Sequence, residues 1–204
     1  MKLSEVASQL NSDSEVVLPS LLFLTDELRI TDPLSIAKCL PKGSGIVLRD
    51  YENSDRLNIA KKLAEISYDR DLTLLIGDDI EIAQLVRADG LHFREKNIPS
   101  TNLKEINEDF IFTVAAHSLE SLHKAGRVGA SAALLSPVFS TKSHPYQKPL
   151  GVRNFRNLVS KSPLPIYALG GINNNNAHEL LSSKAIGLAA IDGIAEEYYP
   201  LTDI

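Results

Sequence analysis

The sequence predicts an α/β protein that is a single (β/α)8 TIM barrel, and three observations predict it. Eight short apolar runs recur along the 204 residues. Most of these runs are almost continuously apolar, as in parallel strands that are buried on both faces. Amphipathic segments lie between the runs, which gives the strand–helix alternation of a barrel. The length predicts one domain, so we expect the barrel to comprise residues 1–204.

Eight strands are expected, at residues 21–24, 45–48, 72–76, 91–93, 110–115, 132–138, 164–169 and 186–191. The clearest helix spans residues 55–68, where apolar residues recur at helical spacing and Ser54 precedes them as the expected N-cap. Further helices are expected at 80–87, 118–125, 151–161 and 176–182. The competing architecture is an open doubly wound sheet, whose usual G-x-G-x-x-G turn after the first strand is missing here.

The composition argues against several classes of protein and of site. The formal net charge is −5, which disfavours a nucleic-acid partner. No run of about 18 apolar residues occurs, so no membrane span is expected. Cys39 is the single cysteine, which rules out an internal disulfide and a multi-cysteine metal site. Residues 1–15 are polar and lack the apolar core of a secretory signal, so we expect a cytoplasmic location.

Glycine and polar residues gather where the apolar runs end, and the carboxyl ends of barrel strands usually carry the function. Gly170 and Gly171 follow the seventh run, and Ile191, Asp192 and Gly193 close the eighth. Loops after strands seven and eight commonly hold phosphate, and glycine lets backbone N–H groups approach it. We expect a phosphate there, and two ordinary strand-to-helix turns are the alternative. The Asp192 carboxylate would repel that phosphate unless it turns outward, where it could cap the following segment.

Two histidines and an arginine stand at other strand ends. His117 follows the fifth run and could move protons near neutral pH, or it could only cap or pack against the next helix. His92 lies between apolar neighbours, which favours packing. Arg49 could bind a phosphate or a carboxylate, or it could pair with the adjacent Asp50.

Two acidic residues and one long loop are the remaining candidate features at the strand ends. Asp78 and Asp79 follow the third run and could hold magnesium, which prefers oxygen ligands. We favour the alternative that one of them caps the helix at 80–87, because no third carboxylate is obviously placed nearby. The polar, locally basic loop at 140–148 is either a lid over the site or a solvated loop.

Six motifs stand in order at the expected strand ends: residues 22–26 (LFLTD), 47–50 (VLRD), 88–92 (ADGLH), 116–118 (AHS), 136–141 (SPVFST) and 168–172 (ALGGI). Together they resemble the thiamine phosphate synthase superfamily, which includes the thiazole tautomerase. The resemblance covers residues 21–195, nearly the whole chain. It implies a (β/α)8 barrel that binds a thiazole phosphate at its C-terminal face. The binding residues expected there are Arg49, Thr141, Ser143, Gly170, Gly171, Ile191 and Gly193.

The synthase of this superfamily joins a hydroxymethylpyrimidine pyrophosphate to the thiazole phosphate, helped by magnesium and cationic side chains. Several of its positions differ in this chain. Tyr51 stands at the family's lysine, Gly77 and Asn97 at two positions of its magnesium motif, Ala115 at its serine and His144 at the lysine of its sixth loop. Magnesium is therefore expected only if the chain is a synthase, and otherwise no cofactor or metal is expected.

The tautomerase shifts a double bond in a thiazole carboxylate phosphate, and a single histidine can carry that proton. Its histidine matches His117 in this sequence. The resemblance therefore favours a tautomerase-like enzyme in which His117 is catalytic. A divergent synthase and a non-catalytic thiazole-phosphate-binding or regulatory barrel are the alternatives. The expected partner is a small phosphorylated molecule, and assembly into a homo-oligomer is left open.

Overall fold

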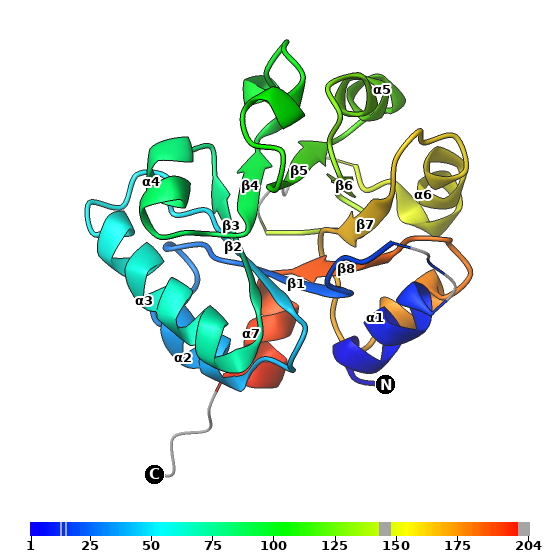
Figure 1. The fold of residues 1–204 in the computed structure, drawn as a ribbon. Coiled ribbons are helices and arrows are strands. Elements are labelled where there is room, and N and C mark those ends of the chain that lie inside the picture. The colour runs from blue at the N-terminus through cyan, green and yellow to red at the C-terminus, as the bar shows by residue number, and fades with distance from the viewer. Residues whose placement is uncertain (13, 15, 143–147, 200–204) are drawn as a thin grey trace, which may run out of the picture.

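Eight parallel strands close into one barrel in the computed structural model, which describes residues 1–12, 14, 16–142 and 148–199 (Figure 1). Each strand pairs with the next, and β8 pairs with β1 to close the ring. The strands are β1 (Leu21–Leu24), β2 (Gly45–Leu48), β3 (Thr73–Gly77), β4 (Gly90–Phe93), β5 (Ile111–Ala116), β6 (Ala132–Leu135), β7 (Ile166–Leu169) and β8 (Gly187–Ala190). Every expected run overlaps one of them, so the predicted fold class is confirmed.

Helices alternate with the strands and lie around the outside of the barrel (Figure 1). The α-helices are α1 (Leu3–Asn11), α2 (Pro33–Cys39), α3 (Arg56–Arg70), α4 (Ile80–Leu85), α5 (Leu119–Arg127), α6 (Gly151–Val159) and α7 (Asp192–Tyr198). Short 3₁₀ helices span η1 (Glu95–Asn97), η2 (Leu103–Glu105) and η3 (Ala177–Leu180). This order keeps the carboxyl ends of all eight strands at one end of the barrel, which we call its mouth.

Two local predictions about the helices need correction. Asp55 rather than Ser54 is the N-cap of α3, and the Asp55 carboxylate accepts a hydrogen bond from the Asn58 side chain at 2.6 Å. Residues 176–182 contain the 3₁₀ helix η3 and no α-helix. The Asn173 N–H donates to Asn176 Oδ1 at 2.9 Å, and this side-chain turn takes up part of the segment that the prediction assigned to the helix.

The N-terminal helix α1 was not expected from the sequence. It packs against β8 and β1, and its apolar face, including Leu3, Val6 and Leu10, is buried. The Leu3 N–H donates to Glu197 Oε2 at 2.9 Å, and the Asn11 amide donates to the Ile186 carbonyl at 2.9 Å. These contacts tie the start of the chain to its last strand and last helix.

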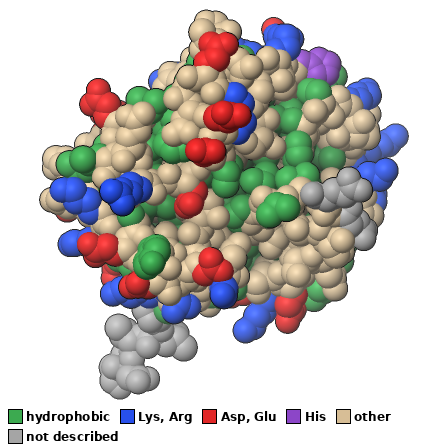
Figure 2. Space-filling view, viewed as in Figure 1, with side chains coloured by type: hydrophobic (Ala, Val, Ile, Leu, Met, Phe, Trp, Pro, Cys, Tyr) green, Lys and Arg blue, Asp and Glu red, His purple; other side chains and the backbone are tan. Residues whose placement is uncertain are grey.

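The surface seen in Figure 2 mixes charges of both signs. Lysine and arginine side chains lie among acidic ones around its rim, and hydrophobic side chains show in the middle. Among the described residues, no helix is both long enough and apolar enough to cross a membrane.

Candidate functional site

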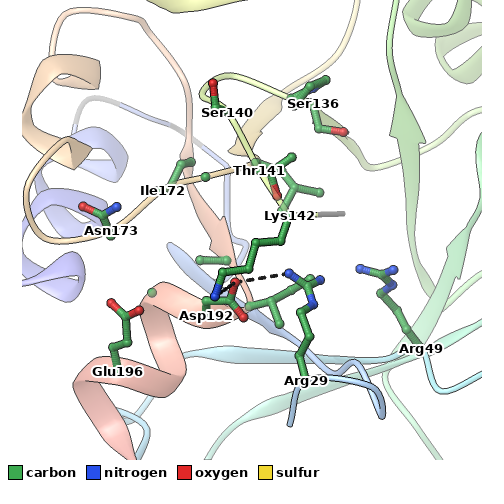
Figure 3. Close-up of a pocket in the computed structure, with 17 residues that line it drawn as sticks. Arg29, Arg49, Ser136, Ser140, Thr141, Lys142, Ile172, Asn173, Asp192 and Glu196 are labelled. Carbon is green, nitrogen blue, oxygen red and sulfur yellow. Dashed lines mark hydrogen bonds and ion pairs between the residues drawn. The ribbon is translucent and has the colours of Figure 1, made fainter. Parts of the chain in front are cut away.

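A cavity of about 240 Å³ opens at the ends of β6, β7 and β8, with contributions from the ends of β1 and β2 (Figure 3). Its lining includes the described residues of the predicted binding set: Arg49, Thr141, Gly170, Gly171, Ile191 and Gly193. Ser143, the remaining member, lies outside the described residues. The structure thus brings together groups that the sequence places on four different strand ends.

Glycine at positions 170 and 171 lets two loops lie directly against each other. Both residues have a positive φ, +103° at Gly170 and +66° at Gly171. A Cβ atom added at Gly171 would lie 2.2 Å from the Ser140 carbonyl oxygen. The Phe139 N–H donates to the Gly170 carbonyl at 3.0 Å. Only glycine combines this backbone conformation with so close an approach, so the turn fixes the shape of the cavity.

Three cationic side chains project into the cavity from different elements (Figure 3). Arg49 comes from the end of β2, Lys142 from the loop after β6, and Arg29 from the loop after β1. Arg29 is held by Asp26, whose carboxylate oxygen lies 2.6 Å from Nη2. Arg29 was not predicted from the sequence, although the spacing of three residues between Asp26 and Arg29 could have suggested a pair. The cavity thus offers cationic groups to an anionic ligand.

The outward turn of Asp192, which the sequence made a condition for phosphate binding, is not found. Asp192 is the first residue of α7, and the N-cap position, Ile191, makes no side-chain capping bond. The Asp192 carboxylate instead faces the cavity cations, 3.3 Å from Arg29 Nη1 and 3.9 Å from Lys142 Nζ (Figure 3). Opposite charges at this separation attract, so the carboxylate turns toward its partners rather than toward solvent. It therefore already neutralises part of the positive charge that a phosphate would use.

Arg49 and Asp50 do not pair among the described residues. Arg49 lines the cavity, whereas Asp50 is buried and its Oδ1 atom has no hydrogen-bond partner in the described part of the chain. The Arg49 N–H donates to the Thr25 hydroxyl at 2.9 Å, which links the ends of β1 and β2. The expected alternative of an Arg49–Asp50 pair is therefore wrong, and the ligand contact of Arg49 stays a prediction.

His117 lies beside the cavity and is not among the residues that line it. It borders a neighbouring hollow of about 560 Å³, together with Glu95, Ser118 and Lys124 among others. Ser118 is the N-cap of α5, so the interpretation of His117 as a helix cap is wrong. Its Nδ1 atom lies 2.8 Å from the Ser136 carbonyl, which can only accept, so Nδ1 carries the hydrogen.

The other nitrogen of His117 faces an acidic residue. Nε2 lies 3.9 Å from Glu95 Oε2, and the side chains of both residues are about one-third exposed. Ser136, whose carbonyl holds Nδ1, also lines the cavity. One residue therefore connects the histidine to the cavity, and a substrate that extends beyond the cavity along Ser136 would approach His117.

His92 is a packing residue, as predicted. It is buried at the end of β4, and its Nδ1 atom lies 2.9 Å from the Thr113 hydroxyl. Burial, together with the nearby positive charge of Arg49, lowers the pKa of His92 to about 3. The imidazole is therefore neutral at physiological pH and is no proton donor for the site.

Asp79 caps a helix, as predicted, and Asp78 has a different role. The Asp79 carboxylate accepts from the Ile82 N–H at 2.9 Å at the start of α4. Asp78 Oδ1 accepts from the Arg94 N–H at 3.0 Å, and Oδ2 accepts from the Asn97 amide at 2.8 Å. Oδ2 also forms an ion pair with Arg94 Nε. The sequence places Arg94 at the end of the fourth run, but its pairing with Asp78 was not predicted.

These contacts decide whether the family's magnesium ion fits here. Magnesium needs carboxylate oxygens that it can coordinate directly, whereas both oxygens of Asp78 are already hydrogen-bonded, and to a cationic residue. No group of three His, Cys, Asp or Glu side chains that could hold a metal occurs in the described ranges. The residues at this position do not fit a magnesium ion.

Comparison with known proteins gives consistent matches. A family model described as thiamine monophosphate synthase matches residues 21–194. The putative thiamine-phosphate synthase 2 of Aquifex aeolicus is 35% identical over 184 residues, which are 88% of this chain and 99% of the relative. The thiamine-phosphate synthase of Methanococcus maripaludis is 29% identical over 174 residues, 84% of each chain.

Solved structures give the same result. A thiamine phosphate pyrophosphorylase from Pyrococcus furiosus superposes with a TM-score of 0.76 at 27% identity, covering 88% of this chain and 89% of the other. FabK from Thermotoga maritima superposes with a TM-score of 0.66 at 14% identity, covering 94% of this chain and 62% of the other. The likeness to FabK shows the barrel fold alone.

Proposed function

The chain belongs to the thiamine monophosphate synthase family, and from this premise we propose that it binds a thiazole phosphate and moves a proton on it through His117. The observation that carries the choice of reaction is the engagement of Asp78 by Arg94 and Asn97. A synthase must help a pyrophosphate to leave, and magnesium usually supports that step. A tautomerase needs only an acid–base group and a bound substrate.

The phosphate group of the substrate would lie in the 240 Å³ cavity. Arg29, Arg49 and Lys142 supply positive charge there, and the turn at Gly170 and Gly171 presents backbone without side chains. Arginine binds phosphate oxygens through two parallel N–H groups, which also orients the ligand. The thiazole ring would then extend past Ser136 toward His117.

His117 would act through Nε2. Because Nδ1 donates to the Ser136 carbonyl, the neutral ring carries its lone pair on Nε2. That atom would accept a proton from one ring position while the double bond moves, and the imidazolium would return the proton to a second position. The Glu95 carboxylate, 3.9 Å from Nε2, would stabilise the imidazolium between the two transfers. Substrate and product then have the same atoms.

A second candidate is thiamine-phosphate synthase itself, and the comparisons favour it over the tautomerase. The relatives named above are called synthases or pyrophosphorylases, and none of them is named a tautomerase. Against it stand Tyr51 at the family's lysine and the hydrogen-bonded state of Asp78. A thiazole-phosphate-binding barrel without catalysis is the third alternative, since binding would need the cavity alone.

The deciding experiment assays both reactions with one purified preparation. Tautomerisation of a thiazole carboxylate phosphate is followed by chromatography, and thiamine phosphate formation is measured with both precursors and magnesium. We expect tautomerisation, and we expect His117→Gln to lower its rate by about 10²–10⁴-fold with little change in substrate binding, as for a general acid–base residue. His123→Gln is the matched control, because His123 is exposed on α5.

The other outcomes assign the other functions. Magnesium-dependent thiamine phosphate formation that survives His117→Gln would establish the synthase in place of the tautomerase. Tight binding of thiazole phosphate without either reaction would establish the non-catalytic barrel. Tautomerisation that survives His117→Gln would remove the histidine from the mechanism.

A further inference from the structure

Arg94, at the end of β4, is a cation that the fold holds in a fixed place. Its backbone N–H and its Nε atom both bind the Asp78 carboxylate. The guanidinium lies over the ring of Tyr51, with its central carbon 3.9 Å from the ring centroid, a close cation–π contact. The side chain is 35% exposed, so part of it still reaches solvent.

The Asp78 carboxylate that holds Arg94 is itself fixed in position. Asp78 has a left-handed backbone with φ of +51°, a conformation that costs energy for a residue other than glycine. Its side chain is only 9% exposed, and the Asn97 amide binds the same oxygen that pairs with Arg94. The backbone strain and the three donors fix the carboxylate, and the carboxylate in turn fixes the guanidinium. An ordinary surface ion pair has none of these restraints.

The remaining edge of the guanidinium can contact a ligand. No hydrogen bond from the Nη atoms of Arg94 is made to another described residue. Two other cations, Arg49 after β2 and Arg56 at the start of α3, belong to the same side of the mouth. The Arg56 guanidinium is engaged by the protein itself, because it donates to the Gly77 carbonyl at 2.5 Å and pairs with Asp79. The Nη groups of Arg94 are thus available for an anion, and arginine recognises planar anionic groups well.

We propose that Arg94 supplies the positive charge at the ends of β3 and β4, where it takes the place of a divalent metal ion. Its guanidinium then binds an anionic group of the substrate. A metal ion would have to displace the guanidinium from Asp78 and would meet its positive charge. The proposal deepens the proposed function and rests on it only for the identity of the anion. Exclusion of the metal follows from Asp78, Arg94 and Asn97 and holds whichever reaction the protein catalyses.

The test measures binding of Mn²⁺, a paramagnetic substitute for Mg²⁺, by electron paramagnetic resonance, so it needs neither substrate nor turnover. We expect the wild-type chain to bind no Mn²⁺ in a way that depends on Asp78. The double variant Arg94→Gly, Asn97→Asp removes the guanidinium and adds a second carboxylate. It should bind Mn²⁺ at least about tenfold more tightly than the wild type. Adding Asp78→Asn should abolish that gain.

A matched control separates the arginine from the added carboxylate. Lys96→Gly, Asn97→Asp makes the same change of charge but keeps Arg94, and Lys96 is exposed. This control should bind Mn²⁺ no better than the wild type. Thermal melts followed by circular dichroism check folding, and Arg94→Gln, Asn97→Asp is the milder alternative if the glycine variant does not fold.

Two results would overturn the proposal. One is wild-type Mn²⁺ binding that Asp78→Asn removes, since the metal would then coexist with Arg94. The other is a folded double variant that binds Mn²⁺ no more tightly than the control, since Arg94 would then not be what excludes the metal. Neither result measures proton transfer by His117. Wild-type Mn²⁺ binding at Asp78 would remove the argument from Asp78 against the synthase, whereas the His117→Gln assay tests the proposed function separately, so the two failures are distinguishable.

Discussion

At the scale of single residues, Asp192 is an acidic side chain that already pairs with cations of the cavity. Its carboxylate lies between Arg29 and Lys142, two of the three cations that face the cavity in the described part of the chain. A phosphate that enters must compete with this internal anion for the same donors. The resulting affinity depends on the balance between repulsion by Asp192 and attraction by Arg49, which carries no such partner among the described residues.

Replacing Asp192 by serine should therefore tighten anion binding. Removal of a carboxylate a few ångströms from a bound phosphate removes a repulsion of about 1–4 kcal/mol, so we expect roughly tenfold tighter binding of inorganic phosphate by calorimetry. Glu196→Gln is the control, since Glu196 lines the cavity but forms no ion pair with the cavity cations in the described structure. Equal affinities of wild type and Asp192→Ser would place the phosphate elsewhere.

His92 makes stability depend on pH in a defined window. Its pKa is about 3 in the folded chain and near 6.5 when unfolded. Between these values the unfolded chain holds a proton that the folded chain lacks, so stability is full above pH 6.5 and falls as the pH drops toward 3. From pH 7 to pH 5 this loss amounts to about 2 kcal/mol.

Denaturant unfolding at pH 7 and pH 5 measures the effect. In His92→Gln, whose side chain does not titrate in this range, the drop in stability between the two pH values should be smaller than in the wild type. His178→Gln, on the exposed side of η3, should retain the wild-type drop. The same drop in all three proteins would mean that other groups cause it.

The sequence alone could place some site residues but not their partners. Gly170, Gly171, Gly193 and Arg49 were predicted because each lies within two residues of the end of an apolar run, and closure of the barrel brings strand ends together. Arg29 and Asp192 are 163 residues apart, and no local sequence pattern predicts such a pair. The Asp78–Arg94 pair was missed for the same reason, because a carboxylate and an arginine on neighbouring strand ends form no motif.

At the scale of elements, the strands were easier to predict than the helices. A strand buried on both faces leaves a continuous apolar run, which survives errors of one or two residues at either end. No apolar strand precedes the helix α1, so the strand–helix alternation does not predict it. Polar residues also separate its buried positions, and the segment therefore resembles an ordinary polar terminus. The segment at 176–182 carries the composition of a helix, but the side chains of Asn173 and Asn176 bind the backbone instead.

The contact between the loops after β6 and β7 gives a prediction at this scale. Gly171→Ala would place a Cβ atom 2.2 Å from the Ser140 carbonyl, and Gly151→Ala would meet no atom within 4 Å. Both glycines have a similar positive φ, +66° and +69°, so the backbone strain of the two alanines is matched. We expect Gly171→Ala to destabilise the fold by about 1–3 kcal/mol more than Gly151→Ala, the cost of overpacking.

Chemical denaturation measures the free energy of unfolding of each variant. Calorimetry with inorganic phosphate measures how tightly the cavity of each variant binds the anion. Displacement of the loop after β6 should weaken phosphate binding in Gly171→Ala but not in Gly151→Ala. Equal stabilities and equal affinities would show that the two loops do not rest on each other through this glycine.

At the scale of the whole molecule, the mouth of the barrel has two sides that carry different functional groups. The ends of β6, β7 and β8 form the cavity with its glycine turn and its cations, whereas the ends of β2, β3 and β4 carry Tyr51, Asp78 and Arg94. His117, after β5, stands between these sides along the ring of strands. A substrate with a phosphate at one end and a second anionic group at the other suits this arrangement.

The N-terminal helix α1 is expected to unfold together with the barrel as one cooperative unit. The buried apolar residues form one cluster that runs from Leu3 to Ile194, and the Leu3 side chain is fully buried in it. Leu3→Ala should therefore destabilise the whole barrel by about 2–5 kcal/mol, as truncation of a buried leucine does. Val17→Ala, at a position 97% exposed, should change stability by less than about 0.5 kcal/mol. Denaturation followed by far-ultraviolet circular dichroism and by tyrosine fluorescence should show one transition, shifted to lower denaturant in Leu3→Ala. A separate early transition at an unchanged barrel midpoint would mean that α1 is an appendage, and that the barrel closes without it.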